Sequence, residues 1–407
     1  MKRPLKLLFV LPAYEPAWAL GGIVRCMSNL CRGLASLGHE VTVYAINVDG
    51  RGSILPIPCG EVVVNGGVST YYFPSSFGSS SFFDSRALVG KLRNTICKFD
   101  LVYVSAIWQW LGLSAAKICA RHRVPLIIGP HGSFIKSLQP SLSLRKKIFW
   151  HFFLKKSLSR ASALHFTTVQ ERRHSLDLLN NFKSFVIPNS LDCNYFRPLK
   201  KSRHPFRERY GIPSNVPLII TVGRAVVNKR IDLLIRSLSA VPEINLLIVG
   251  PEPGDVRRQW EDLAEKLQLS RRIFWAGYLQ GEELLAAYSA ADIFSLISSG
   301  ENFGMVVVEA MACGLPVLLN PEIGVCDELR NKQGVLVVDQ DSDRIGDALT
   351  YFVRHRLSWA SWRKNCRQVA KEIFAHDKVA GLMTQACEDV LTGNFAPACR
   401  WVIPARC

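Results

Sequence analysis

Short apolar runs alternate with longer stretches of helical periodicity along most of the chain. Residues 7–11 form an apolar run typical of a buried strand, and residues 22–37 then place apolar side chains three or four positions apart until Gly38 ends the pattern. Further apolar runs continue this alternation at residues 41–45, 101–104, 126–128, 163–166 and 185–187. Such a pattern predicts parallel strands joined by helices that cover the sheet.

The second half of the chain repeats the alternation, with apolar runs at residues 218–222, 246–249, 273–276, 293–297, 317–319 and 335–338. We therefore predict an α/β fold of two Rossmann-like, doubly wound domains that face each other across a cleft. The predicted divisions are an N-terminal domain at 1–195, a C-terminal domain at 196–376, a helix at 377–392 that returns toward the N-terminal domain, and a tail at 393–407. Residues 193–217, rich in Pro, Lys and Arg, are interpreted as the link between the domains.

The charge is distributed unevenly between the two halves. Of 407 residues, 50 are Lys or Arg and 33 are Asp or Glu, and residues 1–200 hold 25 of the basic but only 9 of the acidic side chains. This asymmetry favours an anionic partner for the first half, such as a membrane surface or a nucleic acid. No recognisable nucleic-acid module accompanies the charge, so we expect an anionic membrane surface and no nucleic acid.

Residues 145–156 concentrate this basic character, because five Lys or Arg side chains flank a block of aromatic residues. The composition suits an interfacial helix on anionic lipid, and it equally suits a helix that packs its aromatic side chains inward. No segment reaches the length of a membrane-spanning helix, and the 12 cysteines show no C-x-x-C pair. We expect a cytoplasmic protein that can lie on the inner face of the plasma membrane.

The loop after residues 293–297 carries the strongest candidate chemistry. Glu301 and Glu309 lie eight residues apart, and a helix is expected to begin near Gly304 and to end at Gly314. Free backbone N–H groups at a helix start can bind an anion such as a diphosphate. Taken alone, the two glutamates could instead be a loop charge and a polar helix residue.

A second candidate loop follows residues 218–222. Arg224 offers a planar fork for phosphate and Lys229 a point charge on a flexible stem, although a solvated basic loop would look the same. Three weaker candidates lie in the first half. They are the Gly21-Gly22 pair before the first helix, His131 at the end of a strand, and Asn189 near the predicted domain junction.

Taken together, these loops resemble retaining, nucleotide-sugar-dependent glycosyltransferases of family four, which have the GT-B fold. The resemblance runs in family order over nearly the whole chain, and the Glu301 to Glu309 motif with its following Ala-Met-Ala-Cys-Gly-Leu-Pro-Val is its most specific part. The stretches 130–133 and 163–168 look like the branch that builds bacterial surface polysaccharides or lipopolysaccharide.

The resemblance implies a role for each candidate residue. Arg224 and Lys229 would bind the donor diphosphate, Glu309 would hold the ribose hydroxyls, and Glu301 would contact the donor sugar. The remaining implied contacts are to the donor sugar or phosphate, from the backbone of Phe303, Gly304 and Met305, from Gly21, Gly22 and Asn189, and from His131 to the transferred sugar. With two cations on the leaving group, neither a metal nor any other cofactor is expected beyond the nucleotide sugar itself.

The implied activity is transfer of a hexose-type sugar from a nucleoside diphosphate sugar to a glycan or lipid-linked acceptor, with retention, in the synthesis of cell-surface polysaccharide. Two alternatives stay open from the residues alone. One is a basic membrane- or polyanion-binding protein on an inactive α/β scaffold, and the other is a different enzyme of the same fold, such as an epimerase.

Overall fold

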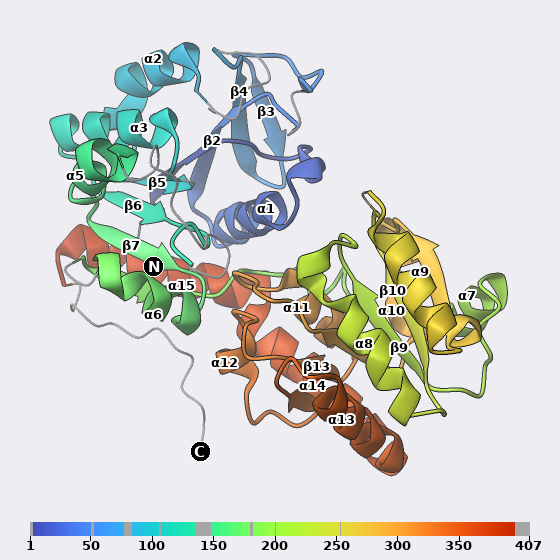
Figure 1. Cartoon of the computed structure of the whole chain (residues 1–407). Coiled ribbons are helices and arrows are strands. Elements are labelled where there is room, and N and C mark those ends of the chain that lie inside the picture. Colours follow the sequence, from blue (N-terminus) through green and yellow to red (C-terminus); the bar gives the residue numbers. More distant parts are fainter. Residues whose placement is uncertain are drawn as a thin grey trace. The chain divides into compact units, whose positions relative to one another are not determined.

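A computed structural model of the chain describes residues 3–49, 53–76, 84–105, 107–135, 148–179, 182–199, 201–252 and 254–394. The chain divides into two compact units (Figure 1). Unit 1 combines Met1–Ser190 with His376–Cys407, and unit 2 is Leu191–Ala375. Among the described residues, no helix has both the length and the apolar character needed to cross a bilayer.

Unit 1 is built on an eight-stranded sheet with the order β3-β4-β2-β1-β5-β6-β7-β8. The strands are β1 (Lys6–Leu11), β2 (Glu40–Ile46), β3 (Val62–Asn65), β4 (Val68–Phe73), β5 (Leu101–Ser105), β6 (Leu126–Gly129), β7 (Ala163–Phe166) and β8 (Ser184–Val186). All neighbours pair in parallel except β3 with β4. Leu7 through Leu11 are all buried, which explains why the strand is a continuous apolar run: both faces of the sheet are covered.

The helices of unit 1 are η1 (Trp18–Leu20), α1 (Gly22–Ser36), α2 (Arg86–Thr95), η2 (Ile96–Lys98), α3 (Trp110–His122), η3 (Trp150–Leu154), α5 (Lys155–Leu158), α6 (Val169–Leu179) and α15 (His376–Thr392). Helix α15 packs against α1 (Figure 1). A Cβ atom on Gly33 would lie 2.7 Å from the carbonyl oxygen of His376, so glycine lets the two helices approach closely. The C-terminal helix therefore belongs to unit 1.

Unit 2 has a six-stranded, fully parallel sheet with the order β11-β10-β9-β12-β13-β14. Its strands are β9 (Leu218–Val222), β10 (Asn245–Val249), β11 (Ile273–Gly277), β12 (Ile293–Leu296), β13 (Val317–Leu319) and β14 (Val335–Val337). Its helices are α7 (Arg203–Arg209), η4 (Val227–Lys229), α8 (Ile231–Ser237), η5 (Leu238–Ala240), α9 (Val256–Lys266), η6 (Ser270–Arg272), α10 (Gly281–Ala290), α11 (Met305–Ala312), α12 (Cys326–Leu329), α13 (Ser342–Arg354), η7 (Arg356–Ser358) and α14 (Trp359–Phe374). Separate hydrophobic cores cover the two faces of this sheet, and the predicted fold of two doubly wound α/β domains is confirmed.

The interpretation of residues 193–217 as a linker is wrong. Helix α7 lies within this stretch and packs against α10 in unit 2. The side chain of Arg207 is buried, with 1% of the residue exposed, and its guanidinium donates to Asp292 and to several backbone carbonyls. The basic residues that suggested a solvated link are in fact paired, and the chain passes from unit 1 to unit 2 between Ser190 and Leu191.

Strands β3 and β4 fall in a stretch where the sequence pattern predicted nothing. They form a hairpin whose two-residue turn is Gly66-Gly67, both with positive φ. Such a turn favours glycine at both positions, so the Gly-Gly pair was a usable signal. Strand β3 lies at the edge of the sheet and is exposed, and its Val-Val-Val run therefore lacks the alternation expected of a half-buried strand.

Candidate active site

The strand order of unit 2 determines where a ligand can bind. β9 and β12 are neighbours at the centre of the sheet, and the chain proceeds outward from them in opposite directions. In an open parallel sheet such a reversal leaves a crevice beyond the carboxyl ends of the two central strands. The loops that follow β9 and β12 lie at this point, and they carry most of the residues predicted from the sequence.

The loop after β9 rests on the loop after β10. Gly223 has φ 146° and donates its N–H to the carbonyl oxygen of Val249 at 2.9 Å. A Cβ atom on Gly250 would lie 1.8 Å from the carbonyl oxygen of Gly223, so only glycine fits at position 250. The sequence analysis missed Gly250, although it follows an apolar run just as Gly223 does.

Lys229 and Glu301 meet at the crevice. Lys229 ends η4, and its Nζ donates to Oε1 of Glu301. The two side chains are 17% and 24% exposed. An ammonium group has three donors, so this ion pair leaves capacity for a second anionic group. Arg224, four residues after the midpoint of β9, is exposed on the same loop.

Hydrogen bonds tie the two loops to each other. The carbonyl oxygen of Asn228 accepts from the hydroxyl of Ser298 at 3.0 Å and from the backbone N–H of Ser299 at 2.7 Å. Glu301 is fixed in turn by its backbone N–H, which donates to the carbonyl oxygen of Glu322 at 3.1 Å. Lys229 and Glu301 are therefore placed by backbone contacts on both sides of the crevice.

Helix α11 begins beside this ion pair. Gly304 caps the helix in the left-handed region, with φ 91° and ψ 56°, and a Cβ atom there would lie 2.9 Å from Cγ2 of Ile323. The first backbone N–H groups of the helix, from Met305 onward, have no partner within the helix itself. Phe303 is buried and packs edge-on against Phe374 at 5.9 Å, so only its backbone can face a ligand.

Glu309 lies in a different environment from Glu301. Because α11 begins only at Met305, the two glutamates are not on one continuous helix. Glu309 is 4% exposed, and its Oε2 accepts from the hydroxyl of Tyr288 on α10 at 3.1 Å. The structure thus brings Glu301 to Lys229, whereas it places Glu309 beside Tyr288, which the sequence analysis did not select.

Unit 1 has its own reversal of strand order, between β1 and β5. The loop after β1 ends at Gly21, which is exposed and has φ 80°, and α1 begins at Gly22. Asn189 is buried, and the carbonyl oxygen of the next residue, Ser190, accepts from Nδ2 of Asn29 at 3.2 Å. Asn189 therefore lies at the end of unit 1, against the helix that follows Gly21-Gly22.

His131 is the end of a chain of hydrogen bonds inside unit 1. It follows β6 with φ 47°, and its Nε2 lies 3.1 Å from the hydroxyl of Tyr103. That hydroxyl lies 2.9 Å from Nδ1 of His165, and Nε2 of His165 lies 2.8 Å from the carbonyl oxygen of Ile187. Tyr103 and His165 sit within buried strands, where the sequence analysis treated them as core residues.

The direction of this chain follows from its last member. A carbonyl oxygen can only accept, so His165 donates from Nε2. Burial lowers the pKa of His165 to about 4, so its ring is neutral at pH 7 and its Nδ1 accepts the Tyr103 proton. The Tyr103 oxygen then accepts from Nε2 of His131, whose pKa is lowered to about 3 by burial and by His165. His131 is thus a neutral ring with its remaining lone pair on Nδ1.

A buried carboxylate holds the loop that carries His131. Glu171 accepts from the backbone N–H of Gly132 at 2.5 Å, and from the N–H and hydroxyl of Thr167 at 2.7 and 2.8 Å. Burial raises the pKa of Glu171 above its usual value. Its sequence signal was Thr168 three positions earlier, the spacing of a capping box, and the Thr168 hydroxyl does accept from the Glu171 N–H. Across the described parts of the chain, no group of three or more His, Cys, Asp or Glu could hold a metal ion.

Comparisons with known proteins agree with this architecture. Residues 202–372 match the model of glycosyl transferases group 1, and residues 20–195 match that of glycosyltransferase family 4. The chain is 25% identical over 406 residues to the mannosylfructose-phosphate synthase of Agrobacterium fabrum, covering 88% of this chain and 84% of that protein.

Two solved structures show the same fold. The sucrose-phosphate synthase of Thermosynechococcus elongatus superposes with a TM-score of 0.71 at 20% identity, over 95% of this chain and 100% of that one. Anabaena HepE in complex with UDP superposes with a TM-score of 0.73 at 17% identity, over the same shares of the two chains. With both of its halves matched by the family models, the chain belongs to the family 4 glycosyltransferases and has their GT-B fold.

Proposed function

We propose that the protein transfers a hexose from a nucleoside diphosphate sugar to a glycan or lipid-linked acceptor, with retention, in the synthesis of cell-surface polysaccharide. The observation that carries the proposal is the Lys229–Glu301 contact at the reversal of strand order in unit 2. It puts a cation beside a carboxylate and the start of α11, which suits a charged diphosphate joined to a sugar rich in hydroxyls. HepE, a protein of the same fold, has been solved with UDP-glucose.

The residues present suggest how the reaction would proceed. The bond between the anomeric carbon and the phosphate oxygen breaks, the acceptor oxygen bonds to that carbon from the same face, and its proton passes to the departing phosphate. Negative charge grows on the diphosphate, where Arg224, Lys229 and the N–H groups at the start of α11 would stabilise it. Glu301 would hold donor sugar hydroxyls and Glu309 the ribose, with Gly21, Gly22 and Asn189 as further donor contacts. No other cofactor enters this scheme.

A screen of donors tests the proposal. We expect one member of a panel of UDP-, GDP- and ADP-sugars to stabilise the protein by about 2.7 kcal/mol when present at 100 times its dissociation constant. Thermal unfolding would measure the shift, with Lys266→Ala as the control because Lys266 is an exposed lysine of unit 2 outside the crevice. If no nucleotide sugar raised the melting temperature, the proposed function would be wrong.

His131 is proposed to accept a hydrogen bond from a hydroxyl of the transferred sugar through Nδ1. Tyr103→Phe removes the hydroxyl that fixes this tautomer, so we expect kcat to fall by about threefold to tenfold while stabilisation by the donor changes little. Tyr44→Phe is the matched control, because the buried Tyr44 also loses one hydrogen bond, to Thr95 at 2.9 Å.

The pH profile separates positioning from a general structural effect. Because the pKa values of His131 and His165 are lowered to about 3 and about 4, the wild-type kcat should stay flat as the pH falls through about 6.5, where an ordinary histidine titrates. An inflection near pH 6.5 in the wild type, or equal losses in the Tyr103 and Tyr44 variants, would contradict the assignment.

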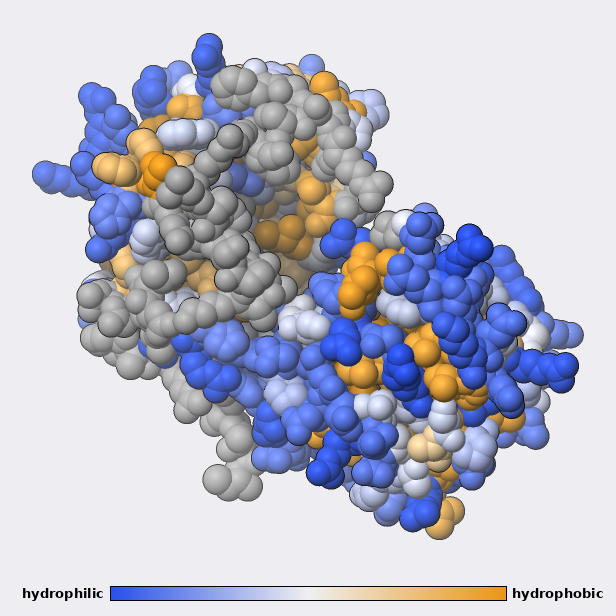
Figure 2. Space-filling view, viewed as in Figure 1, coloured by the Kyte–Doolittle hydropathy of each residue, from blue (hydrophilic) through white to orange (hydrophobic). Residues whose placement is uncertain are grey.

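We also propose that unit 1 lies on anionic lipid through the segment after residue 147. Both alternatives weighed for residues 145–156 hold in part, since Leu154 is buried whereas Ile148, Phe152 and Phe153 are 48%, 68% and 44% exposed. Residues 145–147 lie outside the described residues. Lys155 and Lys156 are exposed beside these apolar side chains, and Figure 2 shows apolar and hydrophilic residues mixed over this part of unit 1.

Vesicle binding tests this membrane surface. Replacing Phe152, Lys155 and Lys156 together by serine should weaken binding to vesicles containing an anionic lipid by about tenfold or more, since each lysine near such a surface contributes about 1 kcal/mol. Leu357→Ser is the control, because Leu357 is fully exposed in unit 2. Co-sedimentation would measure both, and equal binding by the triple variant and the wild type would contradict the proposal.

A further inference from the structure

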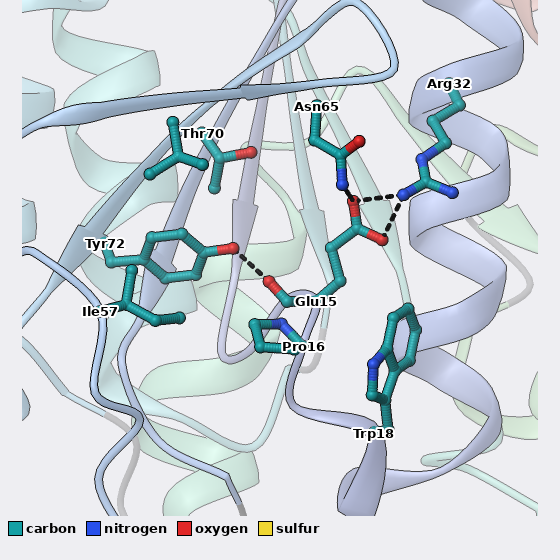
Figure 3. A pocket seen from close by; sticks show the side chains of 9 residues that line it. Glu15, Pro16, Trp18, Arg32, Ile57, Asn65, Thr70 and Tyr72 are labelled. Atoms are coloured by element: carbon teal, nitrogen blue, oxygen red, sulfur yellow. Dashed lines mark hydrogen bonds and ion pairs between the residues drawn. The ribbon is translucent and has the colours of Figure 1, made fainter.

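Unit 1 contains a cavity of about 330 Å³ that no role described so far uses. It lies between the loop after β1, helix α1 and the β3–β4 hairpin (Figure 3). Its lining includes Glu15, Trp18, Ile57, Asn65, Thr70 and Tyr72. The volume is at the small end of the range for ligand-binding sites, so it suits one ring rather than a longer chain.

The polar end of the cavity is neutral. The carboxylate of Glu15 is buried, with the residue 7% exposed, and both of its oxygens accept from Nη2 of Arg32 at 2.8 and 2.7 Å. Oε1 also accepts from Nδ2 of Asn65 at 3.2 Å, and Oε2 from the hydroxyl of Ser28 at 2.8 Å. Four donors thus satisfy the carboxylate, and the arginine compensates its charge. Glu15 is therefore a positioning residue, and the cavity offers no net charge to a ligand.

The walls combine aromatic faces with uncharged hydrogen-bonding groups. Trp18 is 43% exposed, and Figure 3 shows Trp18 and Tyr72 on opposite sides of Glu15 and Pro16. The hydroxyl of Tyr72 donates to the backbone carbonyl of Glu15, so its ring is held in place. Thr70 contributes a hydroxyl, and Asn65 keeps its amide oxygen for a ligand while its nitrogen is bound to Glu15.

We propose that this cavity binds one neutral pyranose ring of the acceptor, a refinement that rests on the proposed transferase function. A pyranose presents an apolar face of C–H groups that suits an indole ring, and hydroxyls that suit Thr70 and Asn65. The donor carries a diphosphate, which matches the cations of unit 2 and not a charge-compensated cavity. Trp18 lies in η1, immediately before the Gly21-Gly22 pair, so the loop that would approach the donor also lines the acceptor cavity.

Fluorine NMR on the full chain labelled with 5-fluorotryptophan tests this site. The probes are the methyl glycosides of glucose, galactose, mannose and N-acetylglucosamine, with glucose 6-phosphate as the anionic comparison. Trp18→Phe assigns the reporting resonance, and Trp110→Phe assigns the control, a tryptophan of unit 1 with a similar exposure of 40%. We expect at least one neutral glycoside to shift the Trp18 signal saturably and to leave the Trp110 signal in place.

Thr70→Val keeps the shape of the side chain and removes its hydroxyl, and it should weaken that glycoside by about threefold to tenfold. Absence of any saturable shift of Trp18, a response to glucose 6-phosphate alone, or an unchanged affinity in Thr70→Val would overturn the assignment. The donor screen is independent, because Trp18→Phe and Thr70→Val should both keep stabilisation by the nucleotide sugar. A wild type that binds the donor but no glycoside refutes this cavity's role alone, whereas a wild type that binds no donor refutes the transferase function.

Discussion

Lys229→Ala is expected to lower kcat/KM for sugar transfer by about 10²–10³-fold, the loss typical of removing one preorganised donor that faces developing charge. Lys229 is placed by the η4 turn, and its ammonium contacts Glu301 at the reversal of strand order in unit 2. Its charge is therefore in position before the diphosphate begins to leave. Steady-state kinetics with the donor identified by the thermal screen would measure the effect.

The companion variant Glu301→Gln keeps the shape of the side chain and removes its charge. It should also reduce transfer strongly, because the amide no longer fixes the ammonium of Lys229 and accepts less strongly from the sugar hydroxyls. Both side chains are partly exposed, so the fold should survive in each variant. Lys266→Ala should retain full activity, and full activity in both Lys229→Ala and Glu301→Gln would refute the roles given to this pair.

Asp292→Ala is expected to destabilise unit 2 by about 3–5 kcal/mol, because it would leave buried cations without their counter-ion. Asp292 is 5% exposed at the start of β12 and accepts from Arg203 at 2.9 and 3.0 Å and from Arg207 at 2.9 Å. It also accepts from Arg363 at 3.2 Å and from the backbone N–H of Leu218 at 3.0 Å. Burial lowers the pKa of both Arg207 and Arg363, which shows how much these guanidinium groups depend on the carboxylate.

Denaturant unfolding followed by circular dichroism would measure the loss, with unit 2 fitted as its own transition where the two units unfold separately. Glu283→Ala is the control, since Glu283 pairs with Arg209 and both side chains are more than half exposed. That pair should contribute little. A Asp292 variant as stable as the wild type would mean that the arginines find other partners, and the account of α7 as an integral part of unit 2 would fail.

The fold was largely predictable because each buried parallel strand is a continuous apolar run. β1, β9 and β12 could be read in this way, and so could the glycines that end them. The Asp292 cluster could not, because Arg203 and Arg207 lie about 85 residues from their partner and look like a solvated linker until the sheet brings them together. The sequence also gave no reason to connect Arg363 with either of them.

The candidate site was predictable where it consists of loops and unpredictable where it consists of pairings. Lys229 and Glu301 were selected separately, and the structure shows that they touch. Tyr103 and His165 were missed because a polar side chain within an apolar strand reads as core. Only the positions of β5 and β7 in the sheet show that both serve His131.

A crystal structure of the protein with its nucleoside diphosphate tests the central claim most directly. We predict the diphosphate within hydrogen-bonding distance of Arg224 and Lys229 and of the first N–H groups of α11, with the ribose at Glu309. A nucleotide bound elsewhere in unit 2, with Arg224 and Lys229 directed away from its phosphates, would contradict the account.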